Sequence, residues 1–539
     1  MSCIMKMRMR YFIIANDQRF RLSFGRPIGS GGTNNLFYYG RDKMNGNIRS
    51  ITLIAGVLLA MTGCSSDDSD SGSAPPPAST VSVAADTTTT SAQADDLRGL
   101  TYARVAPNAG KIYASGHVSA DPTLRRAVVA RFNADGSPDT TFGGTGFVQL
   151  QATTTVGPAT GNNDETSLGI AELQSGDVVV SVNALEAGGG QSVYLFRVTP
   201  AGVKRTGWGD ADGKVEVVFG GASSASDTAW DVQVDRSVGT DRVVVSGFGT
   251  APNGSGRTDQ DRYVARLNIN NTGAVADPTF NGGNAFTFNS VNNLTDNSRR
   301  TIVEADGKIV QAGYTGDSST GLNNTIVLFR LNANGTLDTT FGGFGAEPTV
   351  LANNTPGYAV FNPFKVDGGG AECYAVGKQS TGRYVTTGYG NATASGGTST
   401  LGYFTTQAPD LVTFRVSGGT ATGIDTSWAN QGHLAIQSEG KRPTPNEERG
   451  RHMVVLADDR VIEVGRYDGN PAAYVLNANG QLDTSASDDG ILELPHGTVN
   501  SQFFTAALSP DDRRVAMTTN ADTTNAPSGG ARLVVLQVN

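Results

Sequence analysis

Short apolar runs recur along the chain at nearly regular intervals. One set of runs is rich in Val, Ile and Tyr, is bounded by Gly, Asn and Asp, and returns every 54 to 77 residues. β-Branched and aromatic residues between such turn formers predict strands. The seven copies lie at 111–117, 177–183, 242–248, 308–314, 383–389, 460–466 and 514–520. Seven copies with this spacing indicate one unit repeated seven times.

Each unit reads as about four short strands in an up-and-down order. A second set of strand-like runs follows the first, at 126–132, 193–198, 262–268, 325–332, 411–416, 472–477 and 532–539. Turn blocks such as 133–146 and 332–345 come next and contain Asp-Gly or Asn-Gly, which favour tight reversals. One four-stranded sheet cannot bury both of its faces, whereas radial stacking of several sheets does. The pattern therefore predicts an all-β fold, a seven-bladed β-propeller of four-stranded antiparallel blades.

The last unit is short by one strand. It ends at Asn539, in its third strand, while a strand-like segment at 80–85 precedes the first unit. We expect this N-terminal strand to pair with 532–538 and to close the ring. The propeller would then occupy 80–539.

The segment before the propeller has the order of a secretory signal. Arg49 precedes the apolar run 51–61, and small residues lead to Cys64. The run is shorter than the roughly 20 residues that span a bilayer. The junction MTGC followed by SSDDSDSGS resembles the lipobox of bacterial lipoproteins, although Met61 stands where that family usually has Leu. The resemblance implies that Cys64 carries lipid, and we expect 44–63 to be the signal peptide.

The segments on either side of the predicted signal peptide can then be interpreted. Residues 64–79, rich in Ser, Asp, Gly and Pro, predict a flexible tether. Residues 1–43 are basic and without periodicity; we interpret them as a mis-assigned upstream extension, with a genuine cytoplasmic extension as the alternative. We expect an exported, membrane-anchored protein, in the outer membrane because Ser65 supplies no acidic retention signal.

The net charge bears on which molecules the protein binds, and the cysteine content bears on whether it forms disulfides. The chain has 41 Lys+Arg and 50 Asp+Glu, and without residues 1–63 these become 32 and 48, a net charge of −16. An acidic body disfavours nucleic acid, which needs a basic stripe. Attachment to a membrane would come from the acyl anchor, and we expect a monomer. With Cys64 acylated, Cys373 has no partner for a disulfide and is expected to be a buried small hydrophobe.

The turn block also resembles a known family. An R-[FLV]-N strand followed by DG-x-x-D-x-x-FG-x-x-G, clearest at 131–146 and 330–345, is similar to the delta-sixty repeat propellers of bacterial envelope proteins. The resemblance covers about 100–539 and weakens in the last three units. It implies a propeller and an exported location, and no settled activity.

The recurring polar and aromatic positions of this block admit two interpretations. Asp residues stand three places before an aromatic residue, at Asp139 with Phe142, Asp277 with Phe280, Asp338 with Phe341, and Asp425 with Trp428. Trp208 keeps the aromatic place, but Arg205 replaces the Asp. A ring of ligand sites is one interpretation; the favoured one is structural, with Asp accepting turn N–H groups and the aromatics wedged between blades. One further interpretation is a brace between this Asp and a third-strand arginine of the same blade, although the second unit argues against a strict pairing; these arginines are Arg131, Arg197, Arg266, Arg330 and Arg415.

No motif of catalysis or metal binding emerges. The chain lacks HExxH, a P-loop and a GxSxG elbow, and its four His are scattered, so we expect no cofactor and no bound metal. Function is expected in the long loops on the face shared by the second-to-third-strand loops and the connections between blades. Aromatic candidates for contact with a partner are Tyr314, Tyr358, Phe361, Phe364, Tyr403 and Phe404; covering blade edges is the equal alternative.

Two functions remain. The first is a non-catalytic cell-envelope lipoprotein, a propeller scaffold that binds protein or glycan through its loop face. The alternative is a hydrolase or lyase acting at the central propeller channel. The innermost strands offer chemistry for the second, although periodicity does not say which side chains face the axis: Arg104, Glu172, Asp231, Glu304, Glu372 and His452. An enzyme is the less favoured hypothesis.

Overall fold

The computed structural model divides the chain into two units, Met1–Ala74 and Pro75–Asn539. In the first unit it describes the backbone of a two-stranded antiparallel hairpin, β1 (Phe12–Ala15) with β2 (Gln18–Arg21). In the second unit it describes residues 81–90, 93–121, 124–153, 165–186, 189–220, 226–290, 295–317, 322–345, 356–362, 369–391, 397–398, 404–405, 410–419, 423–436, 448–495, 501–520 and 530–539. The predicted signal, Cys64 and the tether lie outside the described residues.

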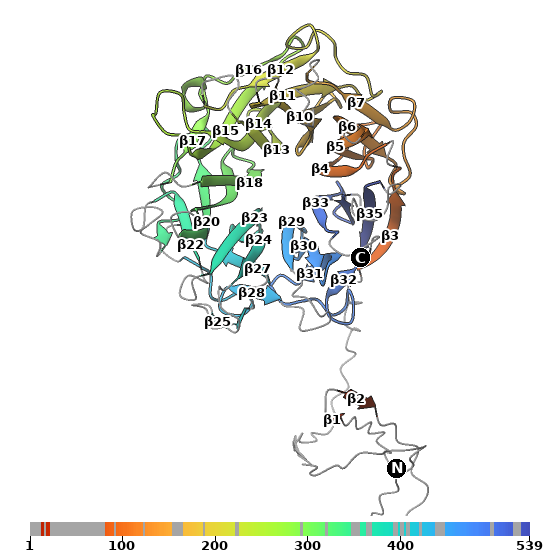
Figure 1. The fold of residues 1–539 in the computed structure, drawn as a ribbon, viewed down its shortest axis with the longest axis vertical. Coiled ribbons are helices and arrows are strands. Elements are labelled where there is room, and N and C mark those ends of the chain that lie inside the picture. Colours follow the sequence, from red (N-terminus) through yellow and green to blue (C-terminus); the bar gives the residue numbers. More distant parts are fainter. Residues whose placement is uncertain are drawn as a thin grey trace, which may run out of the picture. The chain divides into compact units, whose positions relative to one another are not determined.

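The second unit is a seven-bladed β-propeller of antiparallel sheets (Figure 1). The blades follow one another in chain order, each from its innermost to its outermost strand. The first three consist of β4 (Asp96–Tyr102), β5 (Ile112–Asp121), β6 (Leu124–Phe132) and β7 (Phe147–Leu150); β8 (Glu165–Thr166) and β9 (Ile170–Glu172), β10 (Val178–Leu185), β11 (Gln191–Val198) and β12 (Lys214–Val217); β13 (Thr228–Asp235), β14 (Arg242–Thr250), β15 (Gln260–Ile269), β16 (Ala274–Ala276) and β17 (Phe286–Phe288). The short 3₁₀ helix η1 (Asn281–Gly283) precedes β17.

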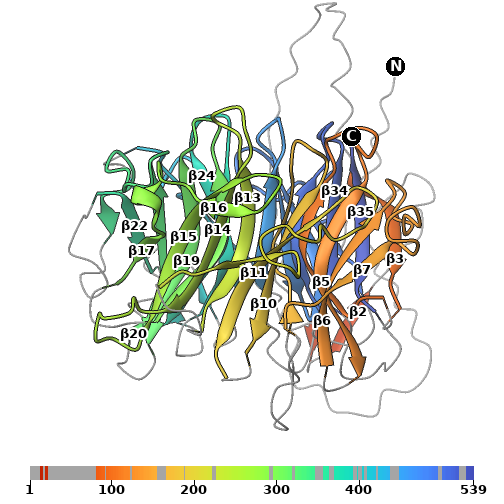
Figure 2. The same ribbon diagram turned by 90° about the horizontal axis from the view of Figure 1, so that it is seen from above.

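The other four blades repeat this order, except that in the fourth blade β21 lies outside β22 and pairs with it in parallel. They consist of β18 (Thr295–Val303), β19 (Ile309–Asp317), β20 (Leu322–Leu331), β21 (Phe344–Gly345) and β22 (Tyr358–Phe361); β23 (Gly370–Lys378), β24 (Tyr384–Asn391), β27 (Asp410–Val416) and β28 (His433–Ile436); β29 (Arg449–Val455), β30 (Val461–Tyr467), β31 (Asn470–Leu476) and β32 (Ile491–Glu493); β33 (Phe503–Leu508), β34 (Arg514–Thr519), β35 (Arg532–Val538) and β3 (Val81–Thr88). A separate two-stranded sheet pairs β25 (Gly397–Thr398) with β26 (Phe404–Thr405). Viewed from the side, the blades run from one face of the ring to the other (Figure 2).

The seventh blade combines both ends of this unit. β3 supplies its outermost strand by antiparallel pairing with β35, from Val81 opposite Val538 to Thr88 opposite Arg532. Arg532 and Asp86 add an ion pair across the two strands, with Nη2 and Oδ2 2.5 Å apart. A segment more than 440 residues away in sequence thus completes the sheet that Asn539 ends, as Figure 1 shows at the positions of β3 and β35.

The core lies between neighbouring blades, with an apolar cluster at each of the seven junctions. Alternate residues of the second and third strands face opposite neighbours, so both faces of a blade are apolar and neither meets water. The aromatic residue of each turn block enters such a cluster. Phe142, Trp208, Phe280, Phe341 and Trp428 are all at most 1% exposed. Each contacts the next blade: a Cβ on Gly480 would lie 2.3 Å from the Trp428 indole, which leaves room only for glycine there.

A charged brace repeats beside these aromatics. In the first blade the third-strand Arg131 donates through Nε to Asp139 Oδ2 at 2.6 Å, and Lys111 of the second strand reaches the same oxygen at 2.5 Å. Asp139 Oδ1 accepts the N–H and hydroxyl of Thr141, so the carboxylate also fixes the turn. Arg131 donates as well to the carbonyl of Pro200, in the second blade. The brace therefore ties one sheet to the next.

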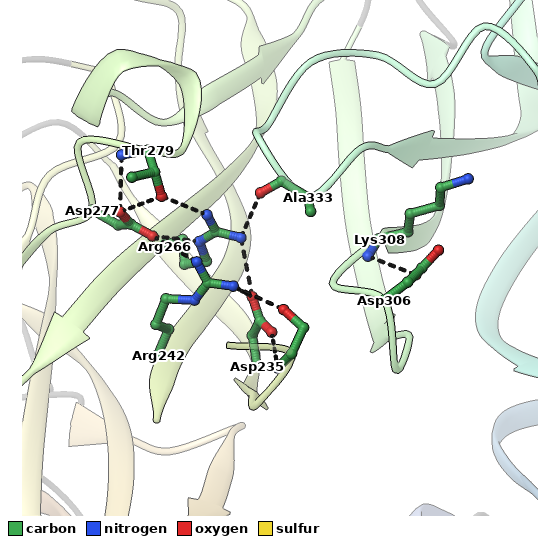
Figure 3. Close-up of polar contacts among 9 residues, drawn as sticks. Asp235, Arg242, Arg266, Asp277, Thr279, Asp306, Lys308 and Ala333 are labelled. Carbon is green, nitrogen blue, oxygen red and sulfur yellow. Dashed lines mark hydrogen bonds and ion pairs between the residues drawn. The ribbon is translucent and has the colours of Figure 1, made fainter. Parts of the chain in front are cut away.

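The third blade shows the same brace with a second arginine (Figure 3). Arg266 Nε is 2.8 Å from Asp277 Oδ2, and its Nη1 donates to the carbonyl of Ala333 in the fourth blade at 2.7 Å. Arg242 takes the place of the lysine and also pairs with Asp235. The fourth and fifth blades repeat the arrangement, through Lys308, Arg330 and Asp338, and through Arg383, Arg415 and Asp425. Burial alone would raise the pKa of Asp338, but its bonds from Thr340 and Lys308 and the charge of Arg330 hold it at about 2.

The second blade has the same brace with two charges exchanged. Arg205 occupies the position of the missing Asp, since its N–H donates to the Arg197 carbonyl at 2.9 Å as that of Asp139 does to Arg131. Asp177 occupies the position of the lysine, and its Oδ2 is 2.5 Å from Nε of both Arg197 and Arg205. The inference that this blade breaks the pairing was therefore wrong, because the carboxylate comes from another strand of the same blade.

Candidate functional site

The innermost strand of every blade carries one extra residue near its start. Pairing with the second strand shifts register between Leu97 and Gly99, and equivalent shifts occur in the other innermost strands. In the second blade the bulge separates β8 from β9. A β-bulge bends its strand and redirects a side chain. The residues at this bulge are Arg98, Leu168, Trp230, Arg299, Tyr374, Arg451 and Phe504.

A glycine of the second strand makes room for the bulge in five blades. A Cβ on Gly116 would lie 1.8 Å from the Asp96 carbonyl oxygen, and one on Gly465 would lie 1.7 Å from that of Arg449. Gly247, Gly313 and Gly388 stand equally close to their innermost strands. These glycines belong to the run that reveals the sevenfold repeat, so the sequence does contain a signal for the bulge.

Six of the bulge residues form a sequence of alternating guanidinium groups and aromatic rings, here called the mouth ring: Arg98, Phe504, Arg451, Tyr374, Arg299 and Trp230. The Arg98 guanidinium carbon lies 4.4 Å from the Phe504 ring centre, and Arg451 lies 4.4 Å from that of Tyr374. Arg299 lies 4.6 Å from Tyr374 and 4.2 Å from Trp230. These are cation–π distances. The innermost strands of six blades thus meet through one continuous contact.

The arginines of the mouth ring differ in how they are neutralised. Arg98 pairs with Asp96, Nε to Oδ2, at 2.5 Å. Arg451 donates to the amide oxygen of Gln502 at 2.8 Å and Arg299 donates to the Tyr314 hydroxyl at 2.6 Å. Within the described residues, neither Arg451 nor Arg299 forms an ion pair with a carboxylate. Buried Nε of Arg299 has no hydrogen-bond partner there either. The mouth ring therefore carries positive charge in an acidic protein.

Arg300 crosses the channel beneath the mouth ring. From the fourth blade it donates to the carbonyls of Leu168, at 2.9 Å, and Arg98, in the second and first blades. Its Nη1 lies 3.4 Å from Asp231 Oδ1 of the third blade. Asp231 is further held by the N–H of Thr301 at 2.9 Å. The Arg300 side chain thus forms a floor under the mouth ring.

A cavity of about 200 Å³ lies along the innermost strands beyond this floor. Its lining includes Arg104, Asp231, Arg300, His452 and Thr505. Burial and the charge of Arg300 lower the pKa of His452 well below its usual range, so the imidazole is neutral. Its buried Nδ1 has no hydrogen-bond partner among the described residues. Burial raises the pKa of Asp231, although Arg300 and Thr301 oppose this.

The sequence offered six residues of the innermost strands as candidates for the channel, and only three of them line this cavity. Arg104, Asp231 and His452 do, while three carboxylates bond elsewhere. Glu172 accepts the N–H of Arg104 at 2.6 Å, and Glu372 accepts from Asn324 at 2.5 Å. Glu304 pairs with Lys378 at 2.6 Å. Periodicity missed Arg300 and the mouth ring because a bulge changes which side chains face the axis.

The aromatic candidates for partner contact lie at several depths in the structure. Tyr314 is 8% exposed and supports Arg299, and Phe361 is 9% exposed and packs on Phe414 with ring centres 5.0 Å apart. Both are buried, because strands β19 and β22 extend through them into the blade interfaces. Tyr358 is half-buried against Phe288 and Phe329. The placement of Phe364 and Tyr403 and the side chain of Phe404 fall outside the described residues.

The described residues include neither a metal-binding cluster nor a membrane-spanning helix. No group of three or more His, Cys, Asp or Glu among them is arranged to hold a metal ion. None of their helices is long and apolar enough to cross a membrane. Cys373 is buried and its thiol has a pKa raised to about 12 by burial. It is therefore protonated at neutral pH, as expected for a small hydrophobe.

The chain resembles known proteins only at low sequence identity. No curated protein sequence matches the chain. Among solved structures, the chain is similar to a protein of unknown function from Dyadobacter fermentans (13% identity, TM-score 0.41, 85% of this chain and 99% of that one). It is also similar to an α-L-arabinanase of Penicillium chrysogenum (10%, 0.38, 68% and 92%) and to a polysaccharide lyase of family PL25, an ulvan lyase (9%, 0.42, 82% and 94%).

A family model matches two stretches of the chain. Residues 110–142 and 304–341, in the first and fourth blades, match the "Domain of unknown function (DUF5122) beta-propeller". These are the two units in which the turn block is most complete. The chain is thus a seven-bladed β-propeller whose first and fourth blades match that family.

Proposed function

We propose that the protein is a lipid-anchored, non-catalytic binding protein of the bacterial cell envelope, which takes a protein or glycan at the loop face of its propeller. The mouth ring is the observation that carries the binding role. The second-to-third-strand loops and the connections between blades open on the face where the innermost strands begin, and the mouth ring lies near that end of those strands. Arginine and large aromatic residues dominate the energetics of protein recognition sites.

The floor supports binding across the mouth ring. Arg300 spans from the fourth blade to the first and second, so a partner would lie over the channel entrance. The delta-sixty repeat resemblance, the lipobox-like MTGC and the polar segment after Cys64 supply the proposed location. A lipid anchor and a tether would hold the propeller near a membrane while leaving it free to turn.

Capture from envelope extracts tests the binding role. The full chain, extracted in detergent, is compared with the Arg451→Ala/Phe504→Ala variant, and bound material is identified by mass spectrometry and sugar analysis. We expect at least one component that the wild type retains and the variant loses. Arg513→Ala is the matched control, because Arg513 is exposed in the turn at the opposite end of β33. Equal recovery by all three proteins would refute binding at the mouth ring.

The anchor has its own test. Cys64→Ser is expected to move the protein from the membrane to the soluble fraction and to abolish labelling with a fatty acid. Ser65→Ala controls for the change beside it and should stay labelled and membrane-bound. Membrane retention of the Cys64→Ser protein would contradict the proposed anchor.

The cavity favours a second candidate, a hydrolase or lyase. A neutral imidazole beside Arg104 and Arg300 places a base near cations. Such a pair is suited to removing a proton next to an anionic group. New reducing or unsaturated ends from an envelope polysaccharide, lost in His452→Ala and kept in the Arg451→Ala/Phe504→Ala variant, would favour this function over the first.

A further inference from the structure

We propose that the ligand of the mouth ring is an acidic polysaccharide, a chain of sugars that carry carboxylates. This inference rests on the proposed function and names its ligand class. Unpaired positive charge is the first reason. Arg299 and Arg451 have no carboxylate partner among the described residues, and Arg299 is only 5% exposed. A bound carboxylate could therefore form charge-assisted hydrogen bonds with Arg451 and with the unbonded Nε of Arg299.

Charge contrast is the second reason. The whole chain has a net charge of −9, and the part after residue 63 carries −16. A concentration of arginine at the channel entrance therefore stands against an acidic surface. Such a local positive site attracts an anion to one place while the rest of the surface repels it. Long polyanions with dense charge, such as nucleic acids, would meet that repulsion over most of their length.

The alternation of cations and aromatic rings is the third reason. Each pair in the mouth ring lies within 5.9 Å, so an aromatic surface adjoins every guanidinium. Trp230 and Phe504 are half-buried and keep part of their surface open. A pyranose ring presents C–H groups that pack on aromatic carbon, and a uronate adds a carboxylate at its edge. A simple anion would use the arginines alone.

The mouth ring is held in place before any ligand arrives. The bulges are fixed by the sheets, Tyr314 orients Arg299, and Gln502 orients Arg451. Arg300 closes the channel below, so a linear chain would lie across the ring. Groups that need not reorder on binding lose less conformational entropy.

Calorimetric titration of the full chain with short oligogalacturonates tests the proposal. Two probes separate its parts: the methyl-esterified oligogalacturonate keeps the sugars without the charge, and polyglutamate keeps the charge without the sugars. We expect binding of the acid form alone. A charge-assisted hydrogen bond contributes about 1.5–3 kcal/mol, so Arg451→Ala should weaken binding about ten- to a hundredfold. Arg451→Lys should weaken it less, and Phe504→Ala should weaken it without altering its salt dependence.

The controls distinguish this inference from the proposed function. Arg513→Ala removes the same charge from an exposed site and should leave the affinity unchanged. Unchanged denaturation midpoints for Arg451→Ala and Phe504→Ala show that the ring variants are folded. Equal binding of polyglutamate or of the ester would overturn the ligand class. So would capture of a protein alone, or no binding of oligogalacturonate, while ring-dependent capture from the envelope would still uphold the proposed function.

Discussion

The exchanged charges of the second blade allow one prediction to be worked through in detail. Asp177 serves both Arg197 and Arg205, whereas elsewhere the carboxylate lies on the turn block and the second-strand residue is Lys or Arg. If the brace needs only one carboxylate between two cations, it should also form when the carboxylate is moved from position 177 to position 205 and a cation takes its place. The perturbation is Asp177→Lys with Arg205→Asp, which gives this blade the charge order of the first and fourth blades.

The burial of each partner sets the expected magnitudes. The side chains of Asp177 and Arg197 are 1% and 7% exposed, so Asp177→Lys leaves a buried arginine facing a second cation. Breaking a buried pair costs about 3–5 kcal/mol. Arg205 is 42% exposed, and its own pair contributes at most about 1 kcal/mol, but Arg205→Asp also sets a second carboxylate beside that of Asp177. We expect the double variant to lie within about 1 kcal/mol of the wild type, with a coupling free energy of about 3 kcal/mol.

Urea unfolding of the four proteins, followed by tryptophan fluorescence, measures this cycle. Trp208 lies beside the brace and is 1% exposed, and the other two tryptophans, Trp230 and Trp428, lie in the third and fifth blades, so the emission reports unfolding of the propeller. Proteolysis rates in native buffer give a second readout if unfolding is not reversible. A double variant as unstable as the sum of the single variants would refute the reasoning, because additivity means that the two positions do not exchange roles.

Further predictions concern the junctions and a buried acid. Glu463, bonded to Thr387 and Thr413, has a pKa raised to about 7 by burial, against an ordinary 4.5. Its contribution to stability is complete below pH 4.5 and is lost by pH 7, about 3 kcal/mol in all; Glu463→Gln should flatten this part of the pH–stability profile, and an unchanged slope would contradict the assignment. Phe341→Ala should cost about 3–5 kcal/mol in urea unfolding by emptying the junction of the fourth and fifth blades, whereas Phe341→Leu should cost about half as much. Gly480→Ala should lower the thermal midpoint by forcing the Trp428 indole to move, and a midpoint equal to that of the wild type would show that the junction yields.

The fold was predictable because its determinants recur in the sequence. A run such as KIVQAGY appears seven times, and seven blades follow from counting. Asp139 and Phe142 could be assigned to turn and junction for the same reason, since a residue needed by each blade must recur in most of them. Arg205 was misread because the comparison was made at one position of the turn block, while the compensating Asp177 stands 28 residues earlier.

The mouth ring was not predictable from alternation. A strand of perfect period two would place Arg98 and Leu100 on the same face, and the bulge at 97–99 breaks that relation. The clue lies in the neighbouring strand: Gly116, Gly313 and Gly465 occur at one position of the repeat, where a side chain would collide with the innermost strand. A glycine that recurs at one position of the second strand therefore indicates a bulge in the innermost strand beside it.

The contrast between recurring and varying positions bears on function as well. Arg131, Arg266 and Arg330 are identical because each closes a junction that every blade must form. The bulge position holds Arg, Leu, Trp, Arg, Tyr, Arg and Phe, although a bulge recurs at this place in all seven blades. A site that serves only ring closure has no physical reason to differ from blade to blade, because the junctions are alike. Because the bulge residues differ from blade to blade, arginines and aromatic rings alternate around the channel, and no single blade contains this alternation. A ligand at the axis of the propeller would contact the residues of several blades at once.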